Sequence, residues 1–226
     1  MTSNTSLSPR LMSVCSFVPK GSRLADIGTD HARVPIYLIK NGIISLAIAS
    51  DIGEGPLKKA AENLEFYNLS GMVDLRLGDG LKTVKGNEAD CAVIAGMGGE
   101  LIANILSAYI PDGLKRLIFQ PMTDPHLVRR AAGRLGFKIT AEDIVPENDK
   151  MYIILCCEPG EMTLSDDEEY LSPRLKAHPL YGEYLSFRLK RLEKAAVQAE
   201  KAGAETDMVK EYRLLKKAYE EIKDVL

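Results

Sequence analysis

The sequence lacks any apolar run long enough to span a bilayer, which excludes a membrane-spanning helix. Its Ser/Thr-rich start, Met1 to Leu11, contains no apolar segment like that of a signal peptide, so we expect a cytoplasmic protein with no membrane partner. Net charge is also small, at −3, and gives no global reason to expect nucleic-acid binding. An RNA partner would therefore require positive charge gathered locally.

Cysteine is scarce, and none of the four cysteines has the CxxC spacing of a zinc or redox site. We expect them to be small buried side chains in a reducing compartment. The sequence also shows no cluster of metal ligands and no Ser/His/Asp arrangement, so it predicts neither a metal site nor a nucleophilic triad. The cysteines are Cys15, Cys91, Cys156 and Cys157.

Short apolar runs alternate with amphipathic segments over the first 135 residues, a pattern typical of α/β proteins with a parallel sheet covered on both faces. The predicted strands are Leu24–Ile27, Leu46–Ser50, Val73–Leu77, Cys91–Ala95 and Leu117–Gln120. The predicted helices run from Ser8-Pro9 to about Val18 and then over Ala32–Lys40, Gly55–Asn68, Gly99–Tyr109 and Pro125–Leu135.

The pattern changes after Gly136. Lys138–Val145 and Tyr152–Glu158 are predicted strands, and the Pro146–Met151 gap between them is too short for a crossover helix. They must form an antiparallel hairpin. A parallel sheet finished in this way resembles the Rossmann-like sheet of class I methyltransferases and differs from an ordinary dinucleotide-binding fold.

The acidic segment Gly160–Glu169 is predicted as a turn, with a domain boundary near Glu161 that divides the chain into residues 1–161 and 162–226. The second part shows two apolar stripes at helical spacing, which predict an antiparallel, coiled-coil-like helical hairpin. The stripes are Leu185, Leu189, Leu192, Ala196 and Ala199, then Tyr212, Leu215, Ala218, Ile222 and Val225.

Candidate ligand-binding residues follow the predicted strands, and the carboxyl ends of parallel strands are where open α/β sheets bind ligands. After the first strand, Gly28 permits a sharp turn and Asp26 could bind a ligand ammonium. Asp51 closes the second strand about 23 residues after Gly28, an interval at which a carboxylate reaches ribose hydroxyls. The alternative for Asp51 is a helix N-cap paired with Glu54.

Three more motifs follow the later strands. Asp79 lies between two glycines and could accept a hydrogen bond from an adenine amine, although a simple turn uses the same residues. Ala95–Gly99 holds three glycines, which are entropically costly unless a ligand approaches the backbone closely. Gln120-Pro121 ends the fifth strand, beside the expected reactive end of the ligand. The convergence of all five motifs on one edge indicates an adenosine-containing ligand.

Two further groups are candidates for the substrate side. Arg129, Arg130 and Arg134 lie on one predicted helix with few acids nearby, which favours phosphate contact. The lysines and arginines of the C-terminal helices are interleaved with glutamates, so a solvated, salt-bridged face is the alternative there. Asp30 and His31 are adjacent and could form either a loop-ordering pair or a catalytic pair.

At these motifs the sequence resembles one family. Leu7–Leu11, Ala25–Ala32, Gly78–Gly80, Ile94–Gly99 and Gln120-Pro121 are similar to the bacterial tRNA adenine-22 N1-methyltransferases, the TrmK family, and the resemblance extends over essentially the whole chain. It implies S-adenosylmethionine as cofactor and N1 of a tRNA adenine as methyl acceptor. One departure is Met122, where family members often carry asparagine.

The resemblance and the strand-end motifs together give the candidate site. The methyl-donor residues are Asp26, Gly28, Asp51, Ile52, Asp79, Gly80, Ala95, Gly96 and Met97. The tRNA-side residues are Arg10, Gln120, Pro121, Arg129, Arg130 and Arg134. Because methylated adenine is cationic, a nearby carboxylate could stabilise it, and Asp30 is the first catalytic candidate, followed by His31.

Three alternatives remain open from the sequence. An NAD-dependent oxidoreductase would use Asp51 equally well, but the first loop lacks GxGxxG. A non-catalytic RNA-binding or partner-binding module could retain the nucleotide pocket. A small-molecule methyltransferase could use the C-terminal helices as a lid or dimer interface. The oligomeric state is left open, with a monomer as one expectation.

Overall fold

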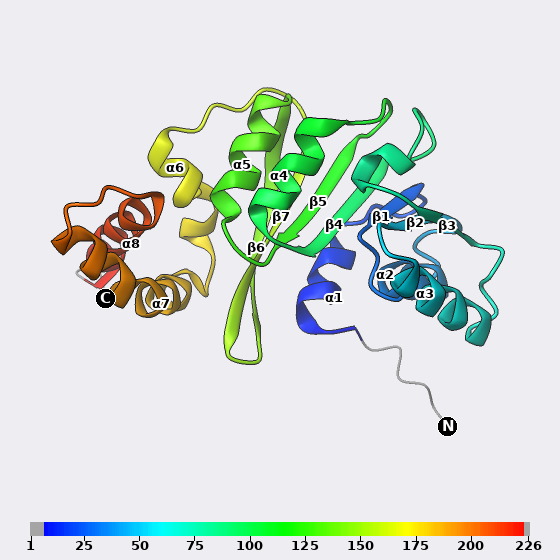
Figure 1. Ribbon diagram of the computed structural model, residues 1–226, viewed down its shortest axis with the longest axis horizontal. Coiled ribbons are helices and arrows are strands. Elements are labelled where there is room, and N and C mark those ends of the chain that lie inside the picture. The colour runs from blue at the N-terminus through cyan, green and yellow to red at the C-terminus, as the bar shows by residue number, and fades with distance from the viewer. Residues whose placement is uncertain (1–6, 224–226) are drawn as a thin grey trace.

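The computed structural model describes residues 7–223, which contain a seven-stranded sheet in the order β3-β2-β1-β4-β5-β7-β6 (Figure 1). The first five strands run parallel, whereas β7 is antiparallel to both β5 and β6. The predicted parallel sheet with a terminal antiparallel hairpin is therefore confirmed. The strands are β1 (Leu24–Ile27), β2 (Ala47–Asp51), β3 (Val73–Leu77), β4 (Cys91–Met97), β5 (Arg116–Pro121), β6 (Phe137–Glu147) and β7 (Lys150–Pro159).

Helices cover both faces of the sheet, and each face has its own apolar core. One core buries Leu11, Leu38 and Leu64 from α1 (Pro9–Ser16), α2 (Arg33–Lys40) and α3 (Glu54–Phe66). The other buries Ile102 and Val128 from α4 (Gly99–Ala108) and α5 (Pro125–Arg134). This two-sided burial explains why β1, β2, β4 and β5 are largely apolar runs, whereas the edge strand β3 includes Asp74 and Arg76. All four cysteines are buried and free, as predicted.

The β6–β7 hairpin is longer than predicted. Pro146 lies inside β6, although we expected it in the connection between the strands. The reason is that β6 is an edge strand, where the missing N–H of proline breaks no ladder hydrogen bond. The strands continue to Glu147 and Lys150, and Asn148 adopts a left-handed φ of +54° in the tight turn. The hairpin therefore projects beyond the rest of the sheet (Figure 1).

The C-terminal segment contains α6 (Asp166–Tyr170), the 3₁₀ helix η2 (Pro173–Ala177), α7 (Tyr181–Lys201) and α8 (Asp207–Lys223). The turn prediction for Gly160–Glu169 is wrong at its end, because Ser165 and Glu168 form a capping box that begins α6. The predicted pair of helices is confirmed, and Thr206 Oγ1 accepts from the Val209 N–H at the start of α8. Val225 of the predicted stripe lies outside the described residues.

Apolar side chains of the C-terminal helices pack into the same core as the sheet. Leu175, Leu185 and Leu215 share one cluster of buried residues with Phe137 and Ile144. The division at Glu161 remains a prediction, and the core is continuous across it. None of the helices within residues 7–223 is long and apolar enough to cross a membrane.

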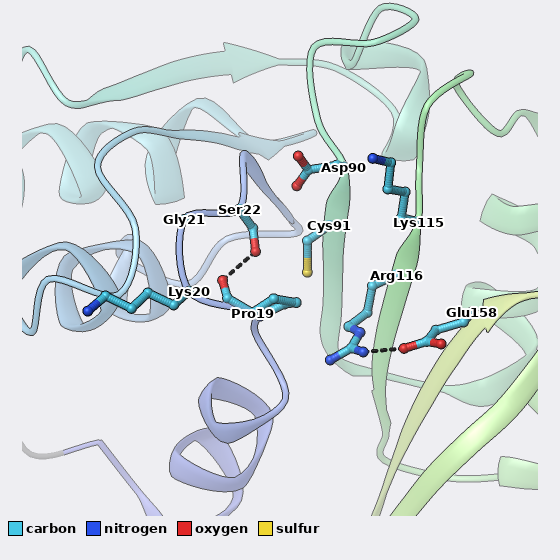
Figure 2. A pocket seen from close by; sticks show the side chains of 9 residues that line it. All are labelled: Pro19, Lys20, Gly21, Ser22, Asp90, Cys91, Lys115, Arg116 and Glu158. Carbon is cyan, nitrogen blue, oxygen red and sulfur yellow. Dashed lines mark hydrogen bonds and ion pairs between the residues drawn. The ribbon is translucent and has the colours of Figure 1, made fainter.

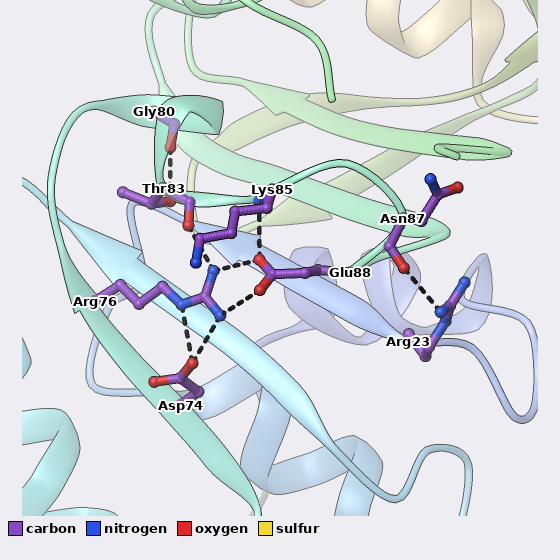
Figure 3. Close-up of polar contacts among 8 residues, drawn as sticks. All are labelled: Arg23, Asp74, Arg76, Gly80, Thr83, Lys85, Asn87 and Glu88. Atoms are coloured by element: carbon purple, nitrogen blue, oxygen red, sulfur yellow. Dashed lines mark hydrogen bonds and ion pairs between the residues drawn. The ribbon is translucent and has the colours of Figure 1, made fainter. Parts of the chain in front are cut away.

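A polar network fastens the connection between β3 and β4 (Figure 3). The Arg76 guanidinium bonds the carboxylates of Asp74 and Glu88 and donates to the Thr83 carbonyl. Arg76 lowers the pKa of Glu88 to about 2. The connection also includes the 3₁₀ helix η1 (Gly80–Thr83), so the network holds the Asp79–Gly80 turn onto the sheet.

Gly99 allows α4 to begin against the loop that follows β5. A Cβ at this position would lie 2.2 Å from the carbonyl oxygen of Asp124 and 2.7 Å from that of Thr123. Neither backbone atom can move as a side-chain end could, so we expect Gly99→Ala to lower the free energy of unfolding by about 2–4 kcal/mol. Gly55→Ala is the control, because its Cβ meets open space. Urea unfolding of both variants measures the difference, and equal stabilities would contradict the close packing.

Candidate active site

The ends of four parallel strands meet at one edge of the sheet. Ile27 at the end of β1 pairs with Ser50 of β2 and Ile94 of β4. Further along, Met97 of β4 pairs with Pro121 of β5. The motifs predicted after these strands therefore lie side by side. They lie at the carboxyl ends of the neighbouring strands β1 and β4. The strand order reverses between these two strands, and α/β sheets bind ligands at such a point.

Asp26 is a buried carboxyl group, with only 5% of the residue exposed. Burial raises its pKa to about 6, helped by the nearby charge of Asp30, while the Thr29 hydroxyl donates a 2.6 Å hydrogen bond that acts in the opposite direction. No salt bridge to Asp26 occurs among residues 7–223. A ligand ammonium placed here would stabilise the ionised form.

Two glycines at this edge adopt left-handed backbone conformations. Gly28 has a φ of +70°, and a Cβ on it would lie 1.9 Å from the Met97 methyl carbon. Gly96 has a φ of +81° and lies at the irregularity in β4–β5 pairing between Ala95 and Met97, as expected of a glycine bulge. At Gly28 the Met97 methyl group fills the space that a Cβ would take, whereas at Gly96 the nearest atom is 4.0 Å away, on Arg10, so a ligand can approach the backbone there.

Asp51 is half-buried at the end of β2, and its Oδ1 accepts a 2.8 Å hydrogen bond from the Gly53 N–H. It does not cap α3, because Gly53 is the N-cap residue and no side-chain cap bond is present there. The N-cap alternative is therefore wrong. Beside it, Ile52 is 76% exposed, an apolar surface suited to a flat ring.

Asp79 follows β3, and its carboxylate is 65% exposed. Lys82 Nζ lies 2.7 Å from Asp79 Oδ2 on the same turn, and the exposed carboxylate is still accessible to a ligand. Gly80 has a φ of +55°, and a Cβ on it would lie 2.9 Å from Ile105 of α4. The glycine is therefore required by packing as well as by the turn.

Arg10 reaches the same edge from α1. Its guanidinium donates a 2.6 Å hydrogen bond to Gln120, lies 3.4 Å from a Glu147 carboxylate oxygen and is 5.7 Å from the Tyr152 ring centre. It is also 4.0 Å from the Cβ position of Gly96. No sequence motif marks Glu147 or Tyr152, since only the hairpin brings them beside α1.

Asp30 and His31 form the loop after Gly28. The Asp30 carboxylate is 67% exposed, with His31 Nε2 at 3.3 Å and Arg33 at 3.8 Å. His31 and Ala32 both adopt left-handed φ angles, of +61° and +54°, which is unfavourable for non-glycine residues. The paired geometry fits either a loop-ordering or a catalytic pair. Its strained backbone is typical of functional loops.

The prediction that Arg129 contacts phosphate is wrong. Its side chain is fully buried, as is that of Glu142, and the two groups form an ion pair at 2.8 Å. Arg129 also donates to the Glu169 carbonyl, which fastens α6 to α5. Of the other two predicted arginines, Arg130 pairs with the Glu169 carboxylate and Arg134 is exposed. A helical amphipathic pattern could not show that one of three arginines faces the core.

Substitutions of these arginines should therefore lower the free energy of unfolding by different amounts. Arg129→Met leaves Glu142 buried without its partner and should lower the free energy of unfolding by about 3–5 kcal/mol. Arg134→Gln should leave stability within about 0.5 kcal/mol, because the side chain is exposed. Urea unfolding compares the two variants. Equal stability of Arg129→Met and the wild type would contradict a structural role for the buried pair.

A separate cavity of about 410 Å³ lies at the opposite edge of the sheet, where β1, β4 and β5 begin (Figure 2). It is lined by Ser22, Cys91 and Arg116, among others, and Arg116 pairs across it with Glu158. None of the predicted site residues lines this cavity. The strand ends described above are therefore the better candidate for the chemistry.

The strand-end site suits S-adenosylmethionine. Asp26 offers a buried carboxylate for the methionine ammonium, and Asp51 and Asp79 offer acceptors for the ribose hydroxyls and the adenine amine. The left-handed glycine Gly96 leaves room for the ligand at the backbone, and Gly28 makes room for the Met97 side chain. The fold and the site together define a Rossmann-like, class I methyltransferase.

The comparisons with known proteins agree. A methyltransferase-domain family model matches residues 7–155. The Bacillus subtilis tRNA (adenine(22)-N(1))-methyltransferase is 38% identical over 182 residues, covering 80% of this chain and 75% of that protein. The chain belongs to the tRNA (adenine(22)-N(1))-methyltransferase family.

Solved structures extend this likeness to the whole chain. The crystal structure of the B. subtilis M1A22 tRNA methyltransferase TrmK has a TM-score of 0.84 and 31% identity, covering 96% of this chain and 100% of that one. Streptococcus pneumoniae Sp1610 in complex with S-adenosyl-L-methionine has a TM-score of 0.84 and 33% identity, covering 95% of this chain and 100% of that one. The helical C-terminal segment is thus part of the shared architecture.

Proposed function

We propose that this protein is an enzyme that transfers a methyl group from S-adenosylmethionine to N1 of an adenine in tRNA, at position 22. The observation that carries the proposal is the meeting of Asp26, Gly28, Asp51 and Gly96 at the point where strand order reverses. Membership of the tRNA (adenine(22)-N(1))-methyltransferase family supports the substrate and the position. A tRNA substrate supports a cytoplasmic location.

On the methyl-donor side, Asp26 would bind the ammonium, Asp51 the ribose and Asp79 the adenine amine. Ile52 would cover the adenine ring, while the backbone of Ala95–Met97 would border the sulfonium end. When bound, the cofactor supplies an electrophilic methyl group. The residues of the protein bind it, orient it and hold the acceptor in line.

On the acceptor side, N1 of adenine is already a nucleophile, with its lone pair in the ring plane. It lies on the Watson–Crick edge, so a paired or stacked adenine must first be extruded. Arg10, held by Gln120 and Glu147, borders the space beside Gly96 where the base would enter. Asp30 would stabilise the positive charge that the base acquires, with His31 orienting it.

Arg130 and Arg134 on α5 supply positive charge for tRNA phosphates, and Arg10 and Gln120-Pro121 would contact the target nucleotide. Position 122 is a methionine that is 38% exposed, and Gln120 Nε2 lies 3.6 Å from its sulfur. A thioether is only a weak hydrogen-bond acceptor, so we assign no base-orienting role to this side chain.

The proposal is tested by incubating unmodified tRNA with the protein and S-adenosylmethionine, followed by mass spectrometry of the released nucleosides. We expect 1-methyladenosine, and its loss when adenine 22 is replaced by guanine. A product at another adenine would contradict the assigned position. No methylated nucleoside from tRNA that binds the protein would contradict the enzymatic activity and leave an RNA-binding module.

A further inference from the structure

Glu147 is the last residue of β6 and lies in the part of the hairpin that packs beside α1 (Figure 1). One of its carboxylate oxygens accepts a 3.0 Å hydrogen bond from the Arg10 backbone N–H. The other oxygen lies 3.4 Å from Nε of the same arginine. A single carboxylate, 137 positions along the chain, therefore holds both the backbone and the side chain of Arg10.

The start of α1 needs this carboxylate because it has no cap of its own. Ser8 is the N-cap residue, but its side chain makes no capping hydrogen bond. Pro9 has no N–H, so the N–H of Arg10 is the first in the helix that needs a partner. An anion is also favourable at the positive end of a helix. Glu147 thus fixes the position at which Arg10 leaves α1.

The carboxylate is ionised at neutral pH. Burial alone would raise the pKa of Glu147, but contacts with the start of α1, those of Arg10 first among them, hold this pKa below its ordinary value. Glu147 is also the one carboxylate that pairs with Arg10 within residues 7–223. Without its charge, the guanidinium would keep only uncharged partners.

The guanidinium of Arg10 is held on its other sides by uncharged groups. Nη1 donates a 2.6 Å hydrogen bond to Gln120, which is fully buried, and the Tyr152 ring centre lies 5.7 Å away. Nη1 is also 4.0 Å from the Cβ position of Gly96, at the open strand end. The Nη2 group donates no hydrogen bond within residues 7–223, so its two N–H groups are available to a ligand.

Holding this side chain in advance has a clear physical benefit. A free arginine side chain samples many rotamers, and fixing it only when a substrate arrives costs conformational entropy. In this protein the hairpin and α1 fix Arg10 before any substrate is present. Its N–H donors therefore already point from a defined place.

We propose that Glu147 is a positioning residue for the methyl transfer. It holds Arg10 so that the guanidinium presents its remaining donors to the acceptor nucleotide beside Gly96. The inference rests on the proposed function, which supplies the acceptor. Glu147 does not touch the nucleotide and acts only through Arg10.

Glu147→Gln is the first test, in the full chain with tRNA as methyl acceptor. Glutamine keeps the size and an oxygen that can cap α1, but it loses the charge that holds the guanidinium. We expect kcat to fall roughly tenfold, because the donors of Arg10 are no longer in place when the acceptor is bound. The KM for tRNA and the affinity for S-adenosylmethionine should each change less than about twofold.

Two control variants separate this effect from general damage to the hairpin. Ser13→Ala removes the 2.6 Å hydrogen bond from Ser13 to Asp143, another contact between α1 and β6 that does not involve Arg10. Glu158→Gln removes the charge of a carboxylate in the same hairpin that pairs with Arg116 at the opposite edge of the sheet. Both should keep the wild-type kcat, and thermal melting checks that each variant folds.

A double-mutant cycle tests whether Glu147 acts through Arg10. Arg10→Ala should lower kcat by itself, and adding Glu147→Gln to it should cause no further loss. Hydrogen exchange gives a readout that needs no activity. The Arg10 backbone amide should exchange faster in Glu147→Ala, which removes the cap, and at close to the wild-type rate in Glu147→Gln.

Wild-type kcat in Glu147→Gln would overturn the proposal and leave Glu147 as a helix cap only. An equal loss in Ser13→Ala, or independent losses from Arg10→Ala and Glu147→Gln, would overturn it as well. The wild-type protein separates the two proposals. If it forms 1-methyladenosine and Glu147→Gln does so equally fast, only the positioning role fails. If the wild type forms none, the proposed function fails and the positioning role fails with it.

Discussion

Asp26→Asn is expected to weaken S-adenosylmethionine binding by roughly 30- to 5000-fold, the usual range for truncating one partner of a buried charged pair. The wild-type carboxylate is buried with no cation in the described residues to pair with, so the ligand ammonium would be its counter-ion. Asparagine keeps the shape and can accept from Thr29, but it loses the charge. Isothermal titration with S-adenosylmethionine measures the loss.

The same substitution should make the ligand-free protein more stable at neutral pH. Burial raises the pKa of Asp26 to about 6 from 3.8, so the folded state holds the proton more tightly than the unfolded chain. Ionisation therefore opposes folding, and stability is lost as pH rises from about 4 to 6 and then stays level. The Asp26→Asn variant avoids this cost, which is on the order of 2–3 kcal/mol above pH 6.

Urea unfolding of the wild type and Asp26→Asn at pH 4 and pH 8 separates the cost of ionising Asp26 from other effects of the substitution on stability. The variant should match the wild type at pH 4 and exceed it at pH 8. Asp112→Asn serves as the control, because its exposed carboxylate on the opposite side of the sheet should show no such pH-dependent difference. A destabilised Asp26→Asn at pH 8, with unchanged affinity for S-adenosylmethionine, would remove Asp26 from the binding site.

Asp30→Ala is expected to lower kcat about 100-fold while changing S-adenosylmethionine affinity less than about twofold. The exposed carboxylate follows the methyl-donor loop and adds to the electrostatic environment of Asp26, so it lies close to the pocket without being buried in it. Its removal takes away the anion that would stabilise the methylated, cationic base. Single-turnover methylation of tRNA, with cofactor binding measured in parallel, distinguishes the two effects.

Asp112→Ala is the matched control for this measurement, since it removes an exposed aspartate from the loop before β5. It should retain wild-type kcat. His31→Asn tests the paired histidine, which lies 3.3 Å from Asp30, and should give a smaller loss if His31 only orients the carboxylate. Unchanged kcat in Asp30→Ala would show that Asp30 and His31 form only a loop-ordering pair.

The order of strands and helices and the edge that carries the candidate site can be predicted from the amino-acid sequence alone. Strands buried on both faces are largely apolar, so β1, β2, β4 and β5 are visible as short apolar runs, and the motifs that follow them meet at one edge. Gly28 and Gly96 could be singled out for the same reason, because a close backbone approach tolerates few other residues. These features depend on local chain chemistry.

Which polar groups face the core, and which distant segments meet, depends on how the elements pack in three dimensions. Arg129 and Arg134 look alike in a helical pattern, yet one is buried against Glu142 and the other is exposed. Pro146 continues a strand only because β6 is at the sheet edge, and that longer hairpin brings Glu147 to Arg10. The Arg10–Glu147 contact joins residues 137 positions apart, and the energies of both contacts depend on packing that no local pattern records.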